Sequence, residues 1–250
     1  MQKTAVWKRI GAALFMMALL LPSSALAKKS RFEKGSVRLE IGPRMTYYVY
    51  TPEEMAPEGL PLVVYIHGSG ESGDRALTAG LPALIQKDAI ASFPAVLLVP
   101  QMPRTNWAYL RNQVMAMVEK VAEEYQTDPD RLTLAGFSMG ATYGWGMIEL
   151  YPEFFTRFAS VCGRMEQEEE LLEPFAGTYV RTYVGTRDTN VPPKSSMKFT
   201  QKLMDAGYPA ELFAIDATHQ QMQKNAFLDQ DLLDFLTWTE PTAEETAENE

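Results

Sequence analysis

Short apolar runs alternate with longer amphipathic stretches along most of the chain. Runs with the length and the β-branched or aromatic content of strands occur at 36–41, 45–52, 61–66, 94–101, 132–137, 157–163, 178–185 and 210–216. Stretches with helical spacing of apolar residues occur at 77–90, 107–125, 142–152, 193–207 and 223–239. This alternation predicts an α/β fold in a single domain, residues 31–240, with a mostly parallel central sheet and helices on both of its faces.

The two ends of the chain do not follow this pattern. Residues 1–27 begin with basic residues, continue with the apolar run IGAALFMMALLL and end in PSSALA, which is the three-part layout of a secretory signal. We expect cleavage after Ala27. An uncleaved anchor is the alternative, although the apolar run is shorter than the roughly 20 residues that span a bilayer. Residues 241–250 are acidic and lack aromatic side chains, which predicts a disordered tail.

Composition and charge narrow the range of partners. Of the 250 residues, 46% are apolar and 22% are charged, which is typical of a globular protein with a sizeable core. Loss of residues 1–27 removes three positive charges and no negative one from the net charge of −9, which leaves −12. Such an acidic surface disfavours nucleic acids and anionic membranes as partners. We therefore expect an exported protein, periplasmic or secreted, that does not associate stably with a membrane after signal cleavage.

The stretch LTLAGFSMGATYGWG contains the candidate nucleophile. Ser138 stands between Gly136 and Gly140, where a predicted strand ends and a predicted helix begins. G-x-S-x-G in this context is typical of a nucleophile elbow, in which a sharp turn holds the serine hydroxyl above the sheet. The turn strains the serine backbone and brings strand and helix so close together that only small neighbours fit. A glycine-rich connection without catalytic chemistry is the alternative.

A nucleophilic serine needs a base, and the base needs an acid to orient it. The chain has two histidines, His67 and His219. The order along the chain after such an elbow is serine, acid, histidine, and only His219 satisfies it. Asp188, in the stretch GTRDTNVPP after a predicted strand, is the candidate acid. Asp205 lies within a predicted helix, and Asp216 lies very close to His219 in the sequence but remains a possible substitute.

The glycine-rich stretch PLVVYIHGSGESGD supplies the remaining part of an acyl-transfer site. Such a site needs two backbone N–H groups directed at the developing oxyanion. Met139 is one expected donor because it follows the nucleophile, and Ser69 is the other, with Gly70 as the alternative. His67 is expected to brace this loop, and Glu71 either fixes the loop or binds substrate.

Neither a cofactor nor a metal is expected. Two separated histidines and one cysteine do not predict a metal site. Cys162, the lone cysteine, is expected to be a small buried hydrophobe, with a reactive thiol as the alternative.

Four separated segments carry a resemblance to a known family. They are PLVVYIHGSGESGD, LLVPQMPRTNW, PDRLTLAGFSMGATYGWGMIELYPEFFTRFASVCG and YVGTRDTNVP. Together they resemble the α/β-hydrolase esterases of the polyhydroxybutyrate-depolymerase, feruloyl-esterase and dienelactone-hydrolase-like group, over about residues 60–235. The resemblance implies an α/β-hydrolase fold, a Ser138–Asp188–His219 triad, an acyl-enzyme mechanism on carboxylic esters and no cofactor. By analogy alone, the substrate is a small-molecule or polysaccharide-linked ester.

The candidate pocket residues are Trp107 and Met222. Trp107 and Tyr109 follow a strand end that points toward the site, although Trp107 could instead pack on the next helix. Met222 stands where an aromatic residue is frequent in the resembling group.

Two other functions remain open. A serine peptidase of the prolyl-oligopeptidase type shares the elbow, but such enzymes carry a large extra domain for which this chain has no room. A non-catalytic exported binding protein on the same fold would be expected to lack one of the triad residues, and all three are present.

Overall fold

The computed structural model describes residues 30–40, 42–53, 59–103, 107, 110–165 and 171–239. The expected signal sequence 1–27 and the expected tail 241–250 lie outside these residues. One compact unit spans Arg31–Glu250, and of the other unit, Met1–Ser30, only Ser30 is described. No helix within the described ranges is both long and apolar enough to cross a membrane.

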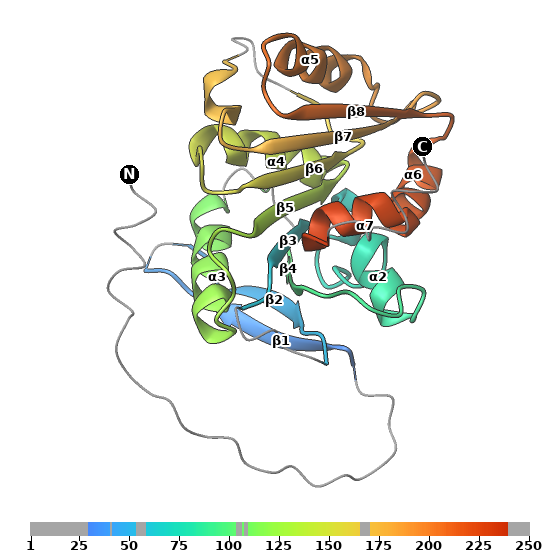
Figure 1. Ribbon diagram of the computed structural model, residues 1–250. Helices are drawn as coiled ribbons and strands as arrows, with labels where there is room; N and C mark the ends of the chain where they lie inside the picture. Colours follow the sequence, from blue (N-terminus) through green and yellow to red (C-terminus); the bar gives the residue numbers. More distant parts are fainter. Residues whose placement is uncertain are drawn as a thin grey trace, which may run out of the picture. The chain divides into compact units, whose positions relative to one another are not determined.

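An eight-stranded sheet lies at the centre of the Arg31–Glu250 unit, in the order β1-β2-β4-β3-β5-β6-β7-β8 (Figure 1). The strands are β1 (Phe32–Val37), β2 (Met45–Tyr50), β3 (Leu62–Ile66), β4 (Val96–Pro100), β5 (Leu132–Phe137), β6 (Arg157–Val161), β7 (Tyr179–Gly185) and β8 (Ala210–Ile215). The pairs β1–β2 and β2–β4 are antiparallel, and the other pairs in the sheet are parallel. The predicted mostly parallel α/β architecture is confirmed.

Helices cover both faces of the sheet. They are α2 (Gly80–Gln86), α3 (Arg111–Glu124), α4 (Met139–Leu150), α5 (Lys194–Asp205), α6 (His219–Asn225) and α7 (Gln230–Thr237), with 3-10 turns at η1 (Ser69–Glu71), η3 (Glu173–Phe175) and η4 (Ala226–Leu228). In Figure 1, α3 and α4 lie on one side of the sheet, and α2 and α7 lie on the other. Every residue of β3, β4 and β5 is buried, as expected for strands covered on both faces.

Two predicted elements differ from the structure. The first strand is β1, residues 32–37, rather than 36–41, because its register pairs Phe32 with Tyr50 and the two rings pack 5.9 Å apart. The helix predicted at 223–239 is broken into α6, η4 and α7. The Asp229 side chain accepts a hydrogen bond from the Leu232 N–H, and this cap starts a new helix.

Candidate active site

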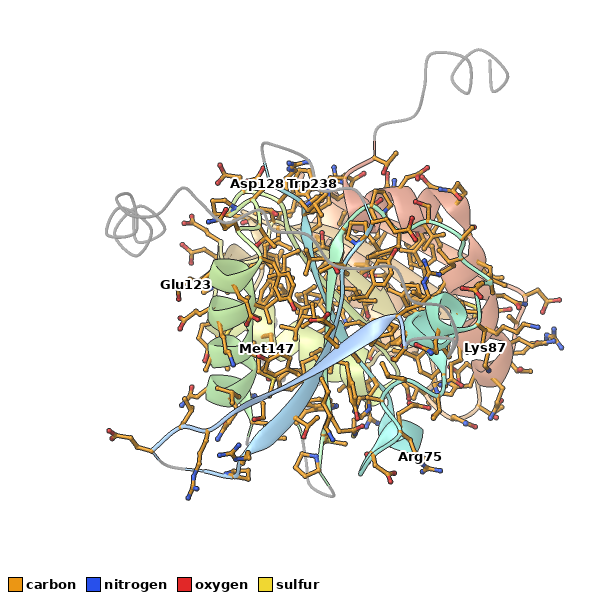
Figure 2. The ribbon with its side chains drawn as sticks, turned by 90° about the horizontal axis from the view of Figure 1, so that it is seen from below. Arg75, Lys87, Glu123, Asp128, Met147 and Trp238 are labelled. Carbon is orange, nitrogen blue, oxygen red and sulfur yellow. The ribbon has the colours of Figure 1, made fainter. Side chains whose placement is uncertain are left out.

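Four neighbouring parallel strands deliver chemically active side chains to one edge of the sheet. The strands β5, β6, β7 and β8 are adjacent and parallel, so their carboxyl ends lie together. The loops after them carry, in the same order, Ser138, Cys162, Asp188 and His219. In Figure 2, Arg75, which follows η1, lies at this end of the sheet, whereas Asp128, which precedes β5, lies at the opposite end.

The turn at Ser138 has the strained geometry expected of a nucleophile elbow. Ser138 has φ 55° and ψ −119°, a left-handed backbone conformation that residues with a side chain rarely adopt. A Cβ on Gly136 would lie 2.6 Å from the Ala141 nitrogen, and a Cβ on Gly140 would overlap the Ile66 carbonyl oxygen. The two glycines therefore allow β5, α4 and the end of β3 to meet at this point.

The three predicted triad side chains form a continuous hydrogen-bonded chain. The Ser138 Oγ hydroxyl lies 2.9 Å from His219 Nε2, and His219 Nδ1 lies 2.6 Å from Asp188 Oδ2. The other oxygen, Asp188 Oδ1, accepts backbone N–H bonds from Asn190 and Val191, both at 2.9 Å. Since this carboxylate accepts from His219 Nδ1–H, the free Nε2 lone pair faces the serine hydroxyl. All three side chains are buried.

The predicted oxyanion donors lie beside this chain. Ser69 and Met139 are the first residues of η1 and α4, where a helix leaves its N–H groups without an intrahelical acceptor. A Cβ placed on Gly68 would lie 3.5 Å from Ser138 Cβ, so the loop that carries Ser69 passes next to the candidate nucleophile. The contact of Gly140 with the end of β3 brings the start of α4 to the same place.

Residues 85–231, more than half of the chain, match the sequence pattern of the Dienelactone hydrolase family. The chain belongs to the dienelactone hydrolase family. A lactone is a cyclic carboxylic ester, and this membership makes the chain a carboxylic ester hydrolase with the α/β-hydrolase fold. None of the curated proteins with which the sequence was compared matches it.

Solved structures of esterases are similar to this member of the dienelactone hydrolase family. A thermostable esterase has a TM-score of 0.70 at 22% identity, with 84% of this chain and 63% of the esterase covered, so the chain spans less than two thirds of that protein. The feruloyl esterase module from Clostridium thermocellum, complexed with sinapinate, has a TM-score of 0.65 at 12% identity and 92% and 99% coverage. Acetyl xylan esterase from Aspergillus awamori has a TM-score of 0.59 at 15% identity and 81% and 99% coverage. At such identities the similarity establishes the fold.

His67 braces the loop after β3, as the sequence predicted. Its Nε2 accepts the Met102 N–H at 3.1 Å, so Nδ1 carries the proton and donates to the Gly68 carbonyl at 2.7 Å. Burial lowers the pKa of His67 from 6.5 to about 4, so the imidazole is neutral near pH 7. Gln101, a residue that the sequence did not single out, donates from Nε2 to the Glu71 carbonyl at 3.0 Å and joins the same loop to the end of β4.

The two predicted pocket residues are not exposed. Trp107 and Met222 each have 0% solvent-exposed surface, so neither lines an open pocket in this structure. The Trp107 ring packs on His67 and on Tyr143 of α4, and its Nε1–H donates to the His67 carbonyl at 3.2 Å. Met222 packs beneath the site, where a Cβ on Gly185 would lie 3.1 Å from its Cγ. Tyr109 lies outside the described residues.

An open cavity adjoins the loop that carries Ser69. It has a volume of about 800 Å³ and is lined by Ser72, Gly73, Asp74, Arg75 and Pro103. Its lining comes from the loops after β3 and β4, and the exposed side chains of Asp74 and Arg75 make it polar.

A contact that the sequence did not predict joins the loop that carries Ser69 to α6, the helix of the candidate base His219. The Gln223 Nε2–H on α6 donates to Glu71 Oε1 at 3.1 Å across 152 residues of sequence. Glu71 is itself buried, and together with the bond from Gln101 this agrees with a loop-fixing role for that residue. No local pattern signals a pairing over such a separation.

Cys162 is buried within the hydrophobic core, as predicted, but it also has polar neighbours. It has φ 51° and lies beside Asp188. Burial, joined by the charge of Asp188 and a hydrogen bond to it, raises the pKa of the Cys162 thiol to about 12, so the thiol is protonated near pH 7. The ligand atoms of Cys162, Asp188 and His219 all lie within 4.8 Å of one another. The sequence argument against a metal site assumed that the cysteine and the histidines lie apart, and the fold brings Cys162 and His219 together.

Proposed function

We propose that the chain hydrolyses carboxylic esters by nucleophilic catalysis, with Ser138 as nucleophile, His219 as general base and acid, and Asp188 as the group that orients His219. The observation that carries this proposal is the pair of hydrogen bonds from Ser138 Oγ to His219 Nε2, 2.9 Å, and from His219 Nδ1 to Asp188 Oδ2, 2.6 Å. A hydroxyl in contact with a base that a buried carboxylate orients is the arrangement that acyl transfer requires.

The first half of the reaction transfers the acyl group to the enzyme. His219 Nε2 takes the Ser138 proton while Oγ attacks the ester carbonyl carbon. The resulting oxyanion accepts hydrogen bonds from the amides of Ser69 and Met139, and the positive end of α4 adds to its stabilisation. The imidazolium then protonates the departing alcohol, and an acyl-Ser138 ester remains.

The second half releases the acid. A water molecule loses a proton to His219 Nε2 and attacks the acyl carbonyl, and the same amides stabilise the second oxyanion. Collapse of this intermediate returns the proton to Ser138 Oγ. Asp188 holds the imidazole tautomer throughout and stabilises the imidazolium without taking its proton.

The direct test is Ser138→Ala. We expect turnover of a chromogenic short-chain aryl ester to fall by at least about 10³-fold, because the nucleophile is lost, while the urea unfolding curve stays cooperative. Ser92→Ala, at an exposed serine outside the site, is the matched control and should keep wild-type turnover. Wild-type turnover in Ser138→Ala would refute the proposal.

Esters attached to plant polysaccharide, or small phenolic and acetyl esters, are the substrate class we propose. The support is analogy with the feruloyl esterase module and the acetyl xylan esterase described above. A panel of aryl esters with acetyl, butyryl and feruloyl acyl groups tests this preference. Equal rates across the panel would leave the ester chemistry in place and refute the preference.

The same panel, with a matched peptide amide added, separates the two competing functions. A serine peptidase would cleave a matched peptide amide at a rate comparable to the ester, and a non-catalytic binding protein would cleave neither. We propose ester cleavage with little or no amide cleavage.

We also propose export after cleavage at Ala27, on the basis of the N-terminal pattern alone. N-terminal sequencing of the mature protein tests this. A mature chain that begins at Met1 would refute it.

A further inference from the structure

One buried cluster in the site contains three different metal-ligand types. The thiol of Cys162, a carboxylate oxygen of Asp188 and a ring nitrogen of His219 lie mutually within 4.8 Å, and all three residues are buried. Thiolate, imidazole and carboxylate are the donors that bind Zn²⁺ in proteins. The proposed reaction uses the histidine and the aspartate but gives the cysteine no role.

We propose that Cys162, Asp188 and His219 form an inhibitory site for a thiophilic divalent cation, Zn²⁺ in the first instance. The ion binds Cys162 Sγ, an Asp188 oxygen and His219 Nδ1. Metal binding itself is independent of the proposed function, whereas inhibition rests on that function.

The distances fit an ion after a small adjustment. Ligands about 2.0–2.3 Å from a tetrahedral Zn²⁺ lie roughly 3.3–3.8 Å from one another. His219 Nδ1 and Asp188 Oδ2, now 2.6 Å apart, must separate by less than about 1 Å to admit the ion between them. The other ligand atoms are at most 4.8 Å apart, so each of these distances must shorten by at most about 1.5 Å. Side-chain rotation supplies movements of this size without a change in the backbone.

Access to the cluster is from the substrate side. Ser138 and His219 each retain 8% of their surface exposed, and they border the cluster on that side. A small ion can therefore reach the buried ligands through the same opening as the scissile ester. A water molecule on that side would complete the coordination.

The ion inhibits ester hydrolysis because its binding moves a proton onto the ring nitrogen of His219 that must act as the base. Coordination displaces the Sγ proton of Cys162 and the Nδ1 proton of His219. A neutral imidazole bound through Nδ1 carries its remaining proton on Nε2, so one of the displaced protons is taken up there and one is released to solvent. Nε2–H then faces Ser138 Oγ and cannot accept its proton. The ion also occupies Asp188, which no longer orients the ring.

The composition of the chain makes the site easy to observe. Cys162 is the only cysteine, so any metal–thiolate charge-transfer absorption arises from it. The only other histidine, His67, has both ring nitrogens engaged with the backbone at Gly68 and Met102. In the described part of the chain, no other thiolate or free imidazole therefore competes for the ion.

The first measurement titrates the purified wild-type protein with Cd²⁺, a spectroscopic substitute for Zn²⁺. We expect a thiolate-to-Cd²⁺ ultraviolet band that saturates at one ion per chain and is reversed by a chelator. Zn²⁺ should compete for the band and Mg²⁺ should not, because Mg²⁺ prefers oxygen ligands. Absence of a saturable band overturns the proposal, and this readout needs no variant.

The second measurement compares wild type with Cys162→Ser, which keeps the size and hydrogen-bond donor but replaces a soft ligand by a hydroxyl. The band should vanish, and the Zn²⁺ concentration for half-inhibition should rise by at least about 10-fold. Each inhibition curve is referred to the same protein's own metal-free rate. Equal inhibition of both proteins would place the ion elsewhere and overturn the proposal.

The two proposals fail in different ways. If the wild-type protein shows the Cd²⁺ band but hydrolyses no ester without metal, the metal site stands and the proposed function fails. If it hydrolyses esters at the same rate with and without Zn²⁺ and shows no band, the function stands and the metal site fails.

Discussion

At the scale of single residues, the close approach at the elbow depends on Gly140. A Cβ at this position would overlap the Ile66 carbonyl oxygen and lie 2.7 Å from that of His67, and both are backbone atoms that cannot move alone. We expect Gly140→Ala to cost about 1–3 kcal/mol of unfolding free energy in urea. Displacement of the elbow should also lower ester turnover by roughly 100-fold.

Gly70→Ala is the matched control for this prediction. A Cβ on Gly70 would meet nothing within 4 Å, and alanine keeps the backbone N–H. Turnover and unfolding free energy should stay near the wild-type values. Equal effects of the two substitutions would show that the tight contact at Gly140 is not the cause.

The choice of acid can be tested by exchanging a carboxylate for an amide. Asp188→Asn should lower kcat by about 10³–10⁴, because the amide favours the imidazole tautomer with its proton on Nε2. Asp216→Asn is the control at the rival aspartate, whose exposed carboxylate pairs with Arg187 at 2.6 Å. That exposed pair should matter little, so turnover should be unchanged. Steady-state kinetics with the chromogenic ester distinguishes the two, and a larger loss in Asp216→Asn would reverse the assignment.

How far the sequence predicts the site depends on how local each signal is. Ser138 and its two glycines form a motif within five positions, and chain order was enough to select His219 over His67. The neighbours of Cys162 could not be predicted without the strand order. Cys162 follows β6, and β6 lies between β5, which precedes Ser138, and β7, which precedes Asp188. Met222 was predicted to line the pocket, yet it is fully buried, since the inward direction of its side chain on α6 is set by packing.

At the scale of elements, periodicity predicts which segments form strands and helices but not where partners align. β1 was placed four residues too late, because residues 36–41 alternate between polar and apolar side chains, whereas the true strand, FEKGSV, does not. The pairing with β2, from Phe32 opposite Tyr50 to Val37 opposite Met45, fixes the register. Between α6 and α7 stand the 3-10 turn η4 and the extended Asp229, whose side chain accepts the Leu232 N–H and caps α7. Apolar spacing continues across that break, so the pattern predicted one helix.

The bond between Gln223 and Glu71 joins the two elements that carry the proposed base and the proposed oxyanion donor. It links α6, which begins with His219, to η1, which begins with the proposed oxyanion donor Ser69. A hydrogen bond to a charged group contributes about 1.5–3 kcal/mol. We expect Gln223→Ala to lower kcat by roughly 10-fold with little change in KM, because an oxyanion donor acts mainly in the transition state.

Gln220→Ala is the control on the same helix, at an exposed glutamine. It should leave kcat unchanged. If Gln223→Ala instead raises KM at constant kcat, the bond contributes to substrate binding rather than to the position of the oxyanion loop.

At the scale of the whole molecule, His67 should make the fold sensitive to acid. Its pKa is about 4 in the folded protein and 6.5 when unperturbed, so the unfolded chain takes up a proton as the pH falls below 6.5 while the folded chain stays neutral. The contribution of His67 to stability is therefore complete above pH 6.5 and is lost progressively down to pH 4, by about 3 kcal/mol. Protonation would also oppose the Met102 N–H that Nε2 accepts, and so release the loop that carries Ser69.

Urea unfolding of wild type and His67→Gln at pH 7, 5.5 and 4.5 isolates this effect, because the carboxylates that also titrate are common to both proteins. The variant should be less stable at pH 7 but lose less stability on acidification, and parallel pH dependences for the two proteins would contradict the neutral, loop-bracing role of His67.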